Sequence, residues 1–207
     1  MSRILAPAIL ALALAIPASA SAETRNVSGF THVSASAGTD VEVVVGPRFS
    51  VEVTGRDAHR IVTRVAGNRL IVEPERGNWF TRGPRDARVR VTMPNVEGLE
   101  ASSGADLVAT GIDSARISLA SSSGADLRAS GRCGAFSADA SSGSDIHAHE
   151  LRCENGSVDV SSGADVRIYA SGRLNVDASS GGGVVAYGDP GIGDIDLSSG
   201  GSLRRAN

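Results

Sequence analysis

Three side chains with ligand chemistry alternate along one short segment near the middle of the chain. Asp145, His147 and His149 are separated by single residues, and alternate residues of a β-strand point to the same side of a sheet. One carboxylate and two imidazoles are donors that bind zinc and similar divalent ions. The spacing makes these residues a candidate metal site, although most exposed histidine pairs hold no ion.

A second set of acidic residues recurs at an almost constant interval. Asp106, Asp126, Asp145 and Asp165 stand 19 or 20 residues apart. Calcium held between carboxylates of adjacent repeats is one interpretation, because aspartate oxygens are suitable calcium ligands. The other is a solvated, charge-balanced face. Basic residues two positions further along would partly neutralise the carboxylates: Arg128, His147, Arg167 and Arg204. Since the calcium-binding consensus G-G-x-G-x-D is absent, we predict the solvated face and no cofactor.

Other chemistry is sparse. Trp79 and Phe80 are adjacent in the segment 77–84 and could contact a sugar or a protein, or cover the core as a hydrophobic lid. All 20 basic residues are arginines, so P-loop and Schiff-base chemistry lack their lysine. A formal net charge of −3 argues against a nucleic-acid partner. The serine-nucleophile motif G-x-S-x-G is also absent, so we expect no catalytic residue.

These residues follow an internal repeat. Ser-Ser-Gly recurs six times at intervals of 18 to 20 residues, with its glycines at positions 104, 124, 143, 163, 181 and 200. The third residue after each glycine is apolar, as is the fifth residue before it, and the intervening positions are polar. Alternation with a period of two indicates β-strands.

A repeat of this length cannot bury its apolar side alone, whereas stacked copies share one core. The pattern therefore predicts an all-β fold, a parallel β-helix or β-solenoid of about six coils. Parallel crossover connections are nearly always right-handed, so we expect that hand. Small residues beside the glycines, such as Ala105 and Ser144, imply a narrow interior. A leucine-rich horseshoe does not fit, because no segment has a helical period.

The two cysteines fall in one column of this repeat. Cys133 and Cys153 each precede the first serine of their own Ser-Ser-Gly by eight residues, so stacking places their Cα atoms about 5 Å apart. That separation suits a disulfide, which an oxidising compartment would permit. We predict a Cys133–Cys153 disulfide, with two free buried thiols as the alternative. Two thiols alone would not complete a tetrahedral metal shell.

Residues 23–95 differ from the repeats that follow. They contain more arginines than acidic residues, whereas residues 96–207 are acidic. Strand-like runs occur at Val41–Val45, Ser50–Thr54, Leu70–Glu73 and Val89–Met93. We expect β-structure that caps or extends the solenoid and is continuous with it, because an end coil presents unpaired strand edges. The C-terminal end has no comparable cap, so we expect end-to-end association or a covering partner there, unless Arg204 and Arg205 prevent it.

Residues 1–22 have the composition of a secretory signal peptide. Arg3 precedes an apolar stretch from Ile4 to Ile16, and small residues at 18–22 fit A-x-A cleavage before Glu23. The stretch is shorter than the roughly 20 apolar residues of a membrane helix. We therefore expect a signal peptide at 1–22, a cap at 23–95 and solenoid repeats at 96–207. The mature chain is expected in the periplasm, outside the cell or on its outer surface, with no membrane span.

Several segments resemble a known family. The stretch Val89–Pro94, followed by Leu99–Asp106 and repeated Ser-Gly-Ala-Asp units, is similar to the putative auto-transporter adhesin head GIN domain. The late segment Val184–Pro190 is similar to the tyrosine-glycine-x-proline segment that closes that family. The similarity covers roughly Phe30 to Leu203. The resemblance implies a bacterial envelope β-helix with an adhesive role, and it supplies no catalytic residues.

Two classes of function fit these features. The first is a non-enzymatic envelope or surface protein that binds a glycan, a protein or the cell wall. Its candidate binding surface comprises Asp106, Asp126, Asp145, Asp165, Trp79 and Phe80. The second is a β-helix carbohydrate-active enzyme, a hydrolase or lyase, using paired carboxylates such as Asp139 and Asp159. An active site must give two carboxylates different environments, whereas these are repeated equally. We therefore favour the first class.

Export of the full chain should remove its first 22 residues. We expect the intact mass of protein recovered from the periplasm or medium of a bacterial host to match a chain that begins at Glu23, because the small residues before it suit signal peptidase. The variant Ala22→Arg should keep the segment attached. Recovery of an exported wild-type chain that still begins at Met1 would contradict the prediction.

Overall fold

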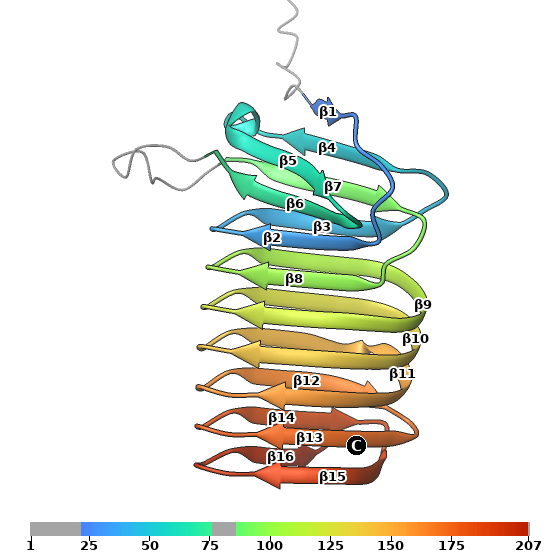
Figure 1. Ribbon diagram of the computed structural model, residues 1–207, viewed down its shortest axis with the longest axis vertical. Helices are drawn as coiled ribbons and strands as arrows, with labels where there is room; N and C mark the ends of the chain where they lie inside the picture. Colours follow the sequence, from blue (N-terminus) through green and yellow to red (C-terminus); the bar gives the residue numbers. More distant parts are fainter. Residues whose placement is uncertain (1–21, 76–85, 207) are drawn as a thin grey trace, which may run out of the picture.

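The computed structural model describes residues 22–75 and 86–206 and shows an all-β solenoid whose coils stack along one axis (Figure 1). The predicted fold class is confirmed. The expected signal segment and the pair Trp79 and Phe80 lie outside the described residues. Within the described ranges, no helix is long and apolar enough to cross a membrane.

Three long strands each form most of one coil, because each bends halfway along its length. These are β9 (Asp106–Ser122), β10 (Asp126–Ser141) and β11 (Asp145–Val160). They pair in parallel and in register, so that Leu107, Leu127 and Ile146 are neighbours. The stack continues through β12 (Asp165–Ala170), β13 (Arg173–Ala178), β14 (Gly183–Tyr187), β15 (Gly191–Leu197) and β16 (Ser202–Arg205).

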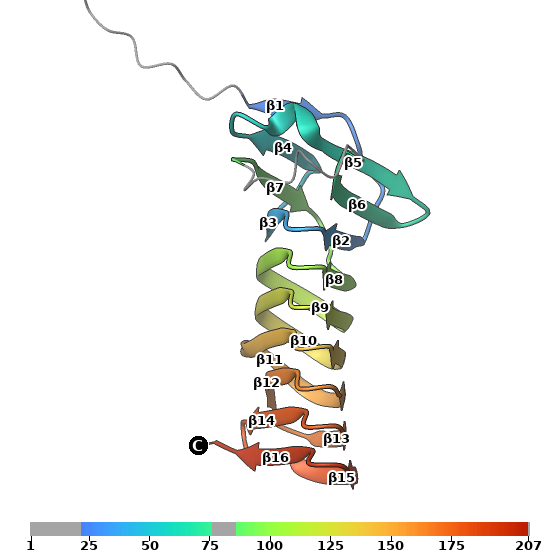
Figure 2. The same ribbon diagram turned by 90° about the vertical axis from the view of Figure 1, so that its left-hand side faces the viewer.

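The stack has two outer faces with a thin core between them (Figure 2). The aspartate face is formed by β3 (Asp40–Val45), the first halves of β9, β10 and β11, and then β12, β14 and β16. The opposite face is formed by β2 (His32–Ser36), β8 (Gly98–Ser102), the second halves of the long strands, β13 and β15. Each coil thus contributes one strand to each face.

Ser-Ser-Gly forms the corner that connects the two faces. Ser103 and Gly104 both have positive φ, 53° and 71°, and the backbone N–H of Ala105 donates to the carbonyl of Ser102 at 3.2 Å. Two successive left-handed residues closed in this way are typical of a type I′ turn. The turn residue that points inward must be small, and Ala105 is fully buried.

A further corner of the same kind occurs within the predicted cap. Ala37 and Gly38 have φ of 56° and 70°, and β2 and β3 on either side of them pair in parallel with β8 and β9. Residues 32–45 are therefore a coil of the solenoid. This coil does not fit the Ser-Ser-Gly repeat of the sequence, because alanine replaces the second serine. More than fifty residues also separate its corner from the next one.

The rest of the N-terminal segment closes the stack. The strands β6 (Arg69–Pro74) and β7 (Arg88–Met93) add one parallel strand to each face. Antiparallel partners then cover them: β5 (Ile61–Ala66) pairs with β6, β4 (Ser50–Thr54) with β7, and β1 (Glu23–Arg25) with β4. A short 3₁₀ turn, Ala58–Arg60, precedes β5. The change from parallel to antiparallel pairing ends the repeat.

The disulfide lies at the second bend of the coils. Cys133 and Cys153 are paired in register between β10 and β11, their Cα atoms are 4.4 Å apart, and their sulfurs are bonded. The predicted disulfide is confirmed. At the C-terminal end, the core side chains Ile195 and Leu197 are 44% and 45% exposed, and end-to-end association there stays a prediction.

The core is narrow enough that large residues need small neighbours. Phe136 on β10 is buried against Gly156 on β11. A Cβ atom at Gly156 would lie 2.1 Å from Cζ of Phe136, a distance that the packed interior cannot accept. The glycine is therefore required by packing, since its φ is not in the left-handed region.

Gly156→Ala should lower the free energy of unfolding by about 1 to 3 kcal/mol, the usual cost of overpacking a core. The measurement is urea denaturation of the wild type, Gly156→Ala, Phe136→Val and the double variant. In the Phe136→Val background the alanine should cost much less, because the ring that it would meet has gone. Strictly additive effects would show that the two residues do not compete for the same space.

Candidate functional site

The aspartate face carries an in-register column of carboxylates. Asp40, Asp106, Asp126, Asp145 and Asp165 are direct neighbours from β3 to β12, at the strand spacing of about 4.8 Å. The column continues with Gly183 and Ser202, which carry no charge. The structure thus assembles the predicted column and adds Asp40 to it. We call this set the aspartate column.

Burial and crowding raise the pKa of one member of this column. The pKa of Asp106 is raised, first because the carboxyl is partly buried and second because Asp126 and Asp40 repel its negative charge. Arg128 opposes the shift. A cavity of about 360 Å³ at this point is lined by Asp40, Glu42, Arg88, Asp106 and Arg128, among others. The surface is therefore mixed in charge, as the prediction of a balanced face requires.

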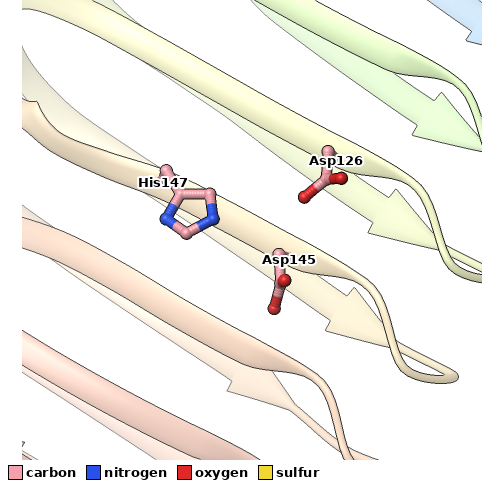
Figure 3. A group of neighbouring side chains, drawn as sticks. All are labelled: Asp126, Asp145 and His147. Atoms are coloured by element: carbon pink, nitrogen blue, oxygen red, sulfur yellow. The ribbon is translucent and has the colours of Figure 1, made fainter.

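The described residues bring one group of candidate metal ligands together, and it differs from the predicted one. Single ligand atoms of Asp126, Asp145 and His147 all lie within 4.8 Å of one another on β10 and β11 (Figure 3). Burial lowers the pKa of His147, and the nearby charges of Arg167 and Arg128 lower it further. The imidazole is therefore neutral at neutral pH, which is the form that binds metals.

Arg167 determines which ring nitrogen of His147 carries the proton. The distance from Nη1 of Arg167 to Nδ1 of His147 is 2.9 Å. A guanidinium has only N–H donors, so Nδ1 accepts and the ring proton must be on Nε2. An ion bound through Nε2 would move that proton to Nδ1, where it would face Arg167. The group is therefore better suited to hydrogen bonding beside the carboxylates than to holding an ion.

His149 does not join this group. The strand β11 shifts its register against both neighbours near this residue, and the His149 ring packs against Tyr187 on β14 with centroids 5.4 Å apart. The candidate set of Asp145, His147 and His149 does not converge, because His149 stands four residues from Asp145, about 13 Å along a strand, and Asp126 from the adjacent coil takes the third place.

A second cluster on the same face was not found from the sequence. A cavity of about 550 Å³ is lined chiefly by His149, Glu150, Arg152, Tyr169, Tyr187 and Asp189. We call it the tyrosine pocket. The signal was present in the repeat, because His149, Tyr169 and Tyr187 each stand six residues after the glycine of three successive coils.

The opposite face carries its own column of acids, with the in-register members Asp139, Asp159, Asp177 and Asp196. Burial raises the pKa of Asp139, and repulsion from Asp159 raises it further. A cavity of about 460 Å³ extends over this column and has no basic residue among its lining side chains. The acids repeat from coil to coil, so the pair Asp139 and Asp159 is part of a column of four acids.

A larger hollow of about 720 Å³ lies over the coil bends near the cap. Ala115, Ile117 and Phe136 contribute apolar lining, and His32, Glu97 and Arg116 contribute polar groups. The His32 ring is positioned by hydrogen-bond contacts of its Nδ1 to Thr31 and Asn68, both at 3.0 Å.

Removal of divalent ions should leave stability unchanged. Because Arg167 occupies the hydrogen-bonding position on His147, we expect the melting temperature to be the same, within about 1 °C, with and without a chelator. Differential scanning calorimetry in EDTA, calcium and zinc makes the comparison. A rise of several degrees with either ion, lost in Asp126→Asn, would show that the group holds a metal.

Neutralising Asp106 should stabilise the protein at neutral pH. An acid whose pKa is raised by folding destabilises the folded state as pH rises through that pKa. Because Asp106 is exposed, solvent screens its charge, so we expect Asp106→Asn to gain roughly 0.5 kcal/mol or less at low salt, and to lose that gain in acid or at high salt. The matched control is Asp113→Asn, because the Arg132 hydrogen bond lowers the pKa of Asp113 and its removal should not stabilise. Equal effects of the two substitutions on thermal unfolding would contradict the account.

Comparison with known proteins agrees with this architecture. Residues 29–190 match the profile of the family described as putative auto-transporter adhesin, head GIN domain. A putative adhesin from Bacteroides fragilis has a TM-score of 0.71 at 13% identity, covering 91% of this chain and 98% of that one. A putative lipid binding protein from Parabacteroides distasonis has a TM-score of 0.56 at 14% identity, covering 92% and 98%.

A putative adhesin from Parabacteroides merdae has a TM-score of 0.52 at 10% identity, again covering 92% of this chain and 98% of that one. Identities this low establish a shared fold and no shared ligand. No curated protein matches the sequence. The family profile covers most of the chain, which therefore belongs to the family of putative auto-transporter adhesin head GIN domains.

Proposed function

We propose that this protein is a non-enzymatic, adhesin-like module of the bacterial envelope or cell surface that binds a glycan, a protein or the cell wall along its outer faces. The observation that carries the proposal is the in-register repetition of charged and polar side chains on two flat faces. Such a surface offers many equivalent contacts to an extended ligand. Membership of an adhesin family supports the same function.

The proposed location follows from the disulfide and the N-terminal segment. A Cys133–Cys153 bond is typical of proteins in an oxidising compartment. The composition of residues 1–22 indicates export. We infer that the mature chain acts in the periplasm or outside the cell, where the ligands proposed above occur.

A carbohydrate-active enzyme is the alternative that the acid pairs suggest. Hydrolysis by two carboxylates requires one protonated acid and one ionised base or nucleophile at the same bond. The raised pKa of Asp139 is one feature that this chemistry would need, but the acids of the opposite face recur through four coils, so the pair is part of a continuous column. A binding function therefore accounts for the surface better than catalysis does.

The test measures binding and turnover on the same ligands. The full exported protein is applied to an array of bacterial glycans and to envelope fractions of a bacterial host, and retained ligands are incubated with it and weighed by mass spectrometry. We expect retention with no change in ligand mass. Shorter or unsaturated products would establish the enzyme, and retention of no glycan, protein or wall fraction would overturn the proposed function.

A further inference from the structure

Both tyrosines of the chain lie in one place. The sequence contains two tyrosines, and Tyr169 and Tyr187 are in-register neighbours on β12 and β14. They occupy the column of the aspartate face that stands six residues after each glycine, where earlier coils have Thr110 and Ser130. In a protein with 3% aromatic residues, this cluster is a local departure from the repeat.

The coils differ in length at this position, and the difference opens the tyrosine pocket. Along the pairing of β11 with β12, Ala148 is opposite Ile168 and the next pair is Arg152 with Tyr169. Three residues of β11, His149–Leu151, therefore have no partner on β12 and form a step above the shorter coil. The Cys133–Cys153 disulfide holds the residue next to Arg152, so the step is fixed on that side.

The pocket has aromatic and polar sides. The Arg152 guanidinium lies 4.6 Å from the centroid of the Tyr169 ring, and Gly188 leaves room for this ring, because a Cβ atom there would lie 2.8 Å from its Cζ. Tyr187 and His149 are tilted by 33° against each other. The volume of about 550 Å³ is within the range of small-molecule sites, roughly 300 to 1,000 Å³.

One residue that lines the pocket has a polar atom without a partner among the described residues. Nδ1 of His149 is buried, and no hydrogen bond to it is present among the described residues. Buried polar atoms are almost always hydrogen-bonded in folded proteins. This nitrogen is closed to solvent in the structure, so a ligand hydroxyl would form the bond only after the imidazole turns toward the pocket, where a hydroxyl could donate or accept.

The charges of the pocket nearly cancel. Glu150 and Asp189 contribute carboxylates, while Arg152 contributes a cation and Arg205 pairs with Asp189 at 3.3 Å. A balanced set of planar hydrogen-bonding groups beside aromatic rings suits an uncharged molecule with many hydroxyls and an apolar face. We propose that the tyrosine pocket binds a pyranose unit of an uncharged glycan, which rests on the proposed adhesin function and names its ligand class.

The two tyrosines provide a direct readout. Protein labelled with 3-fluorotyrosine should give two ¹⁹F resonances, which the variants Tyr169→Phe and Tyr187→Phe assign. Both labelled rings line the pocket. The full oxidised protein is titrated with uncharged and charged oligosaccharides from the array. We expect at least one uncharged oligosaccharide to shift both resonances in a saturable manner.

Variants then test the pocket itself. Tyr187→Ala should weaken binding of that oligosaccharide about tenfold or more, as expected for an aromatic anchor. The matched control is Thr110→Ala, because Thr110 occupies the same column two coils before β11 and should leave affinity unchanged. If Tyr187→Ala folds poorly, the ¹⁹F shifts of the unmutated protein still show whether the oligosaccharide binds in the pocket.

The outcomes separate this inference from the proposed function. A glycan or protein that binds without moving either resonance overturns the pocket and leaves the adhesin function standing. Shifts produced only by charged sugars overturn the ligand class. If no oligosaccharide moves the resonances, the inference fails, and the envelope-fraction experiment decides the proposed function separately.

Discussion

In-register pairing of parallel strands is the interaction on which the other features of this protein depend. Each coil hydrogen-bonds through its backbone to the coil before it and the coil after it, at a spacing of about 4.8 Å. The Ser-Ser-Gly corner makes this possible, because its two left-handed residues turn the chain in the same way in every coil. Side chains at equivalent positions are therefore stacked directly on one another.

Stacking has opposite consequences for apolar and charged columns. Apolar neighbours such as Leu107 and Leu127 exclude water together, whereas stacked carboxylates repel one another, and this repulsion adds to burial in raising the pKa of Asp106. The arginines Arg128 and Arg167 in the next column reduce this repulsion. The face is then a patterned surface of alternating sign, and His147 is part of that pattern through its contact with Arg167.

Departures from the repeat carry the most specific chemistry. Where β11 is longer than β12, the backbone pairing is interrupted and side chains of three coils meet in one pocket. His149, Tyr169 and Tyr187 are brought together there by the step between coils. The regular part of the face provides an extended surface, and the irregular part provides a defined cavity.

The fold and the disulfide could be predicted because both follow from the period of the sequence. The same reasoning placed Asp106, Asp126, Asp145 and Asp165 in one column. It missed the coil at residues 32–45, whose corner contains Ala37 in place of serine. It also named His149 beside Asp145 and His147, although residues four apart on a strand are about 13 Å apart, and the nearer ligand is Asp126 of the adjacent coil. The tyrosines were overlooked for a different reason: their column carries unrelated residues in earlier coils.

The register itself is tested most directly by mapping the disulfide in protein exported by its host. Non-reducing proteolysis followed by mass spectrometry should give one linked pair of peptides, containing Cys133 and Cys153, in a monomeric chain. The account predicts this intramolecular bond because adjacent coils place the two Cα atoms 4.4 Å apart. Two free thiols, or a bond between two chains, would contradict the stacking of β10 on β11.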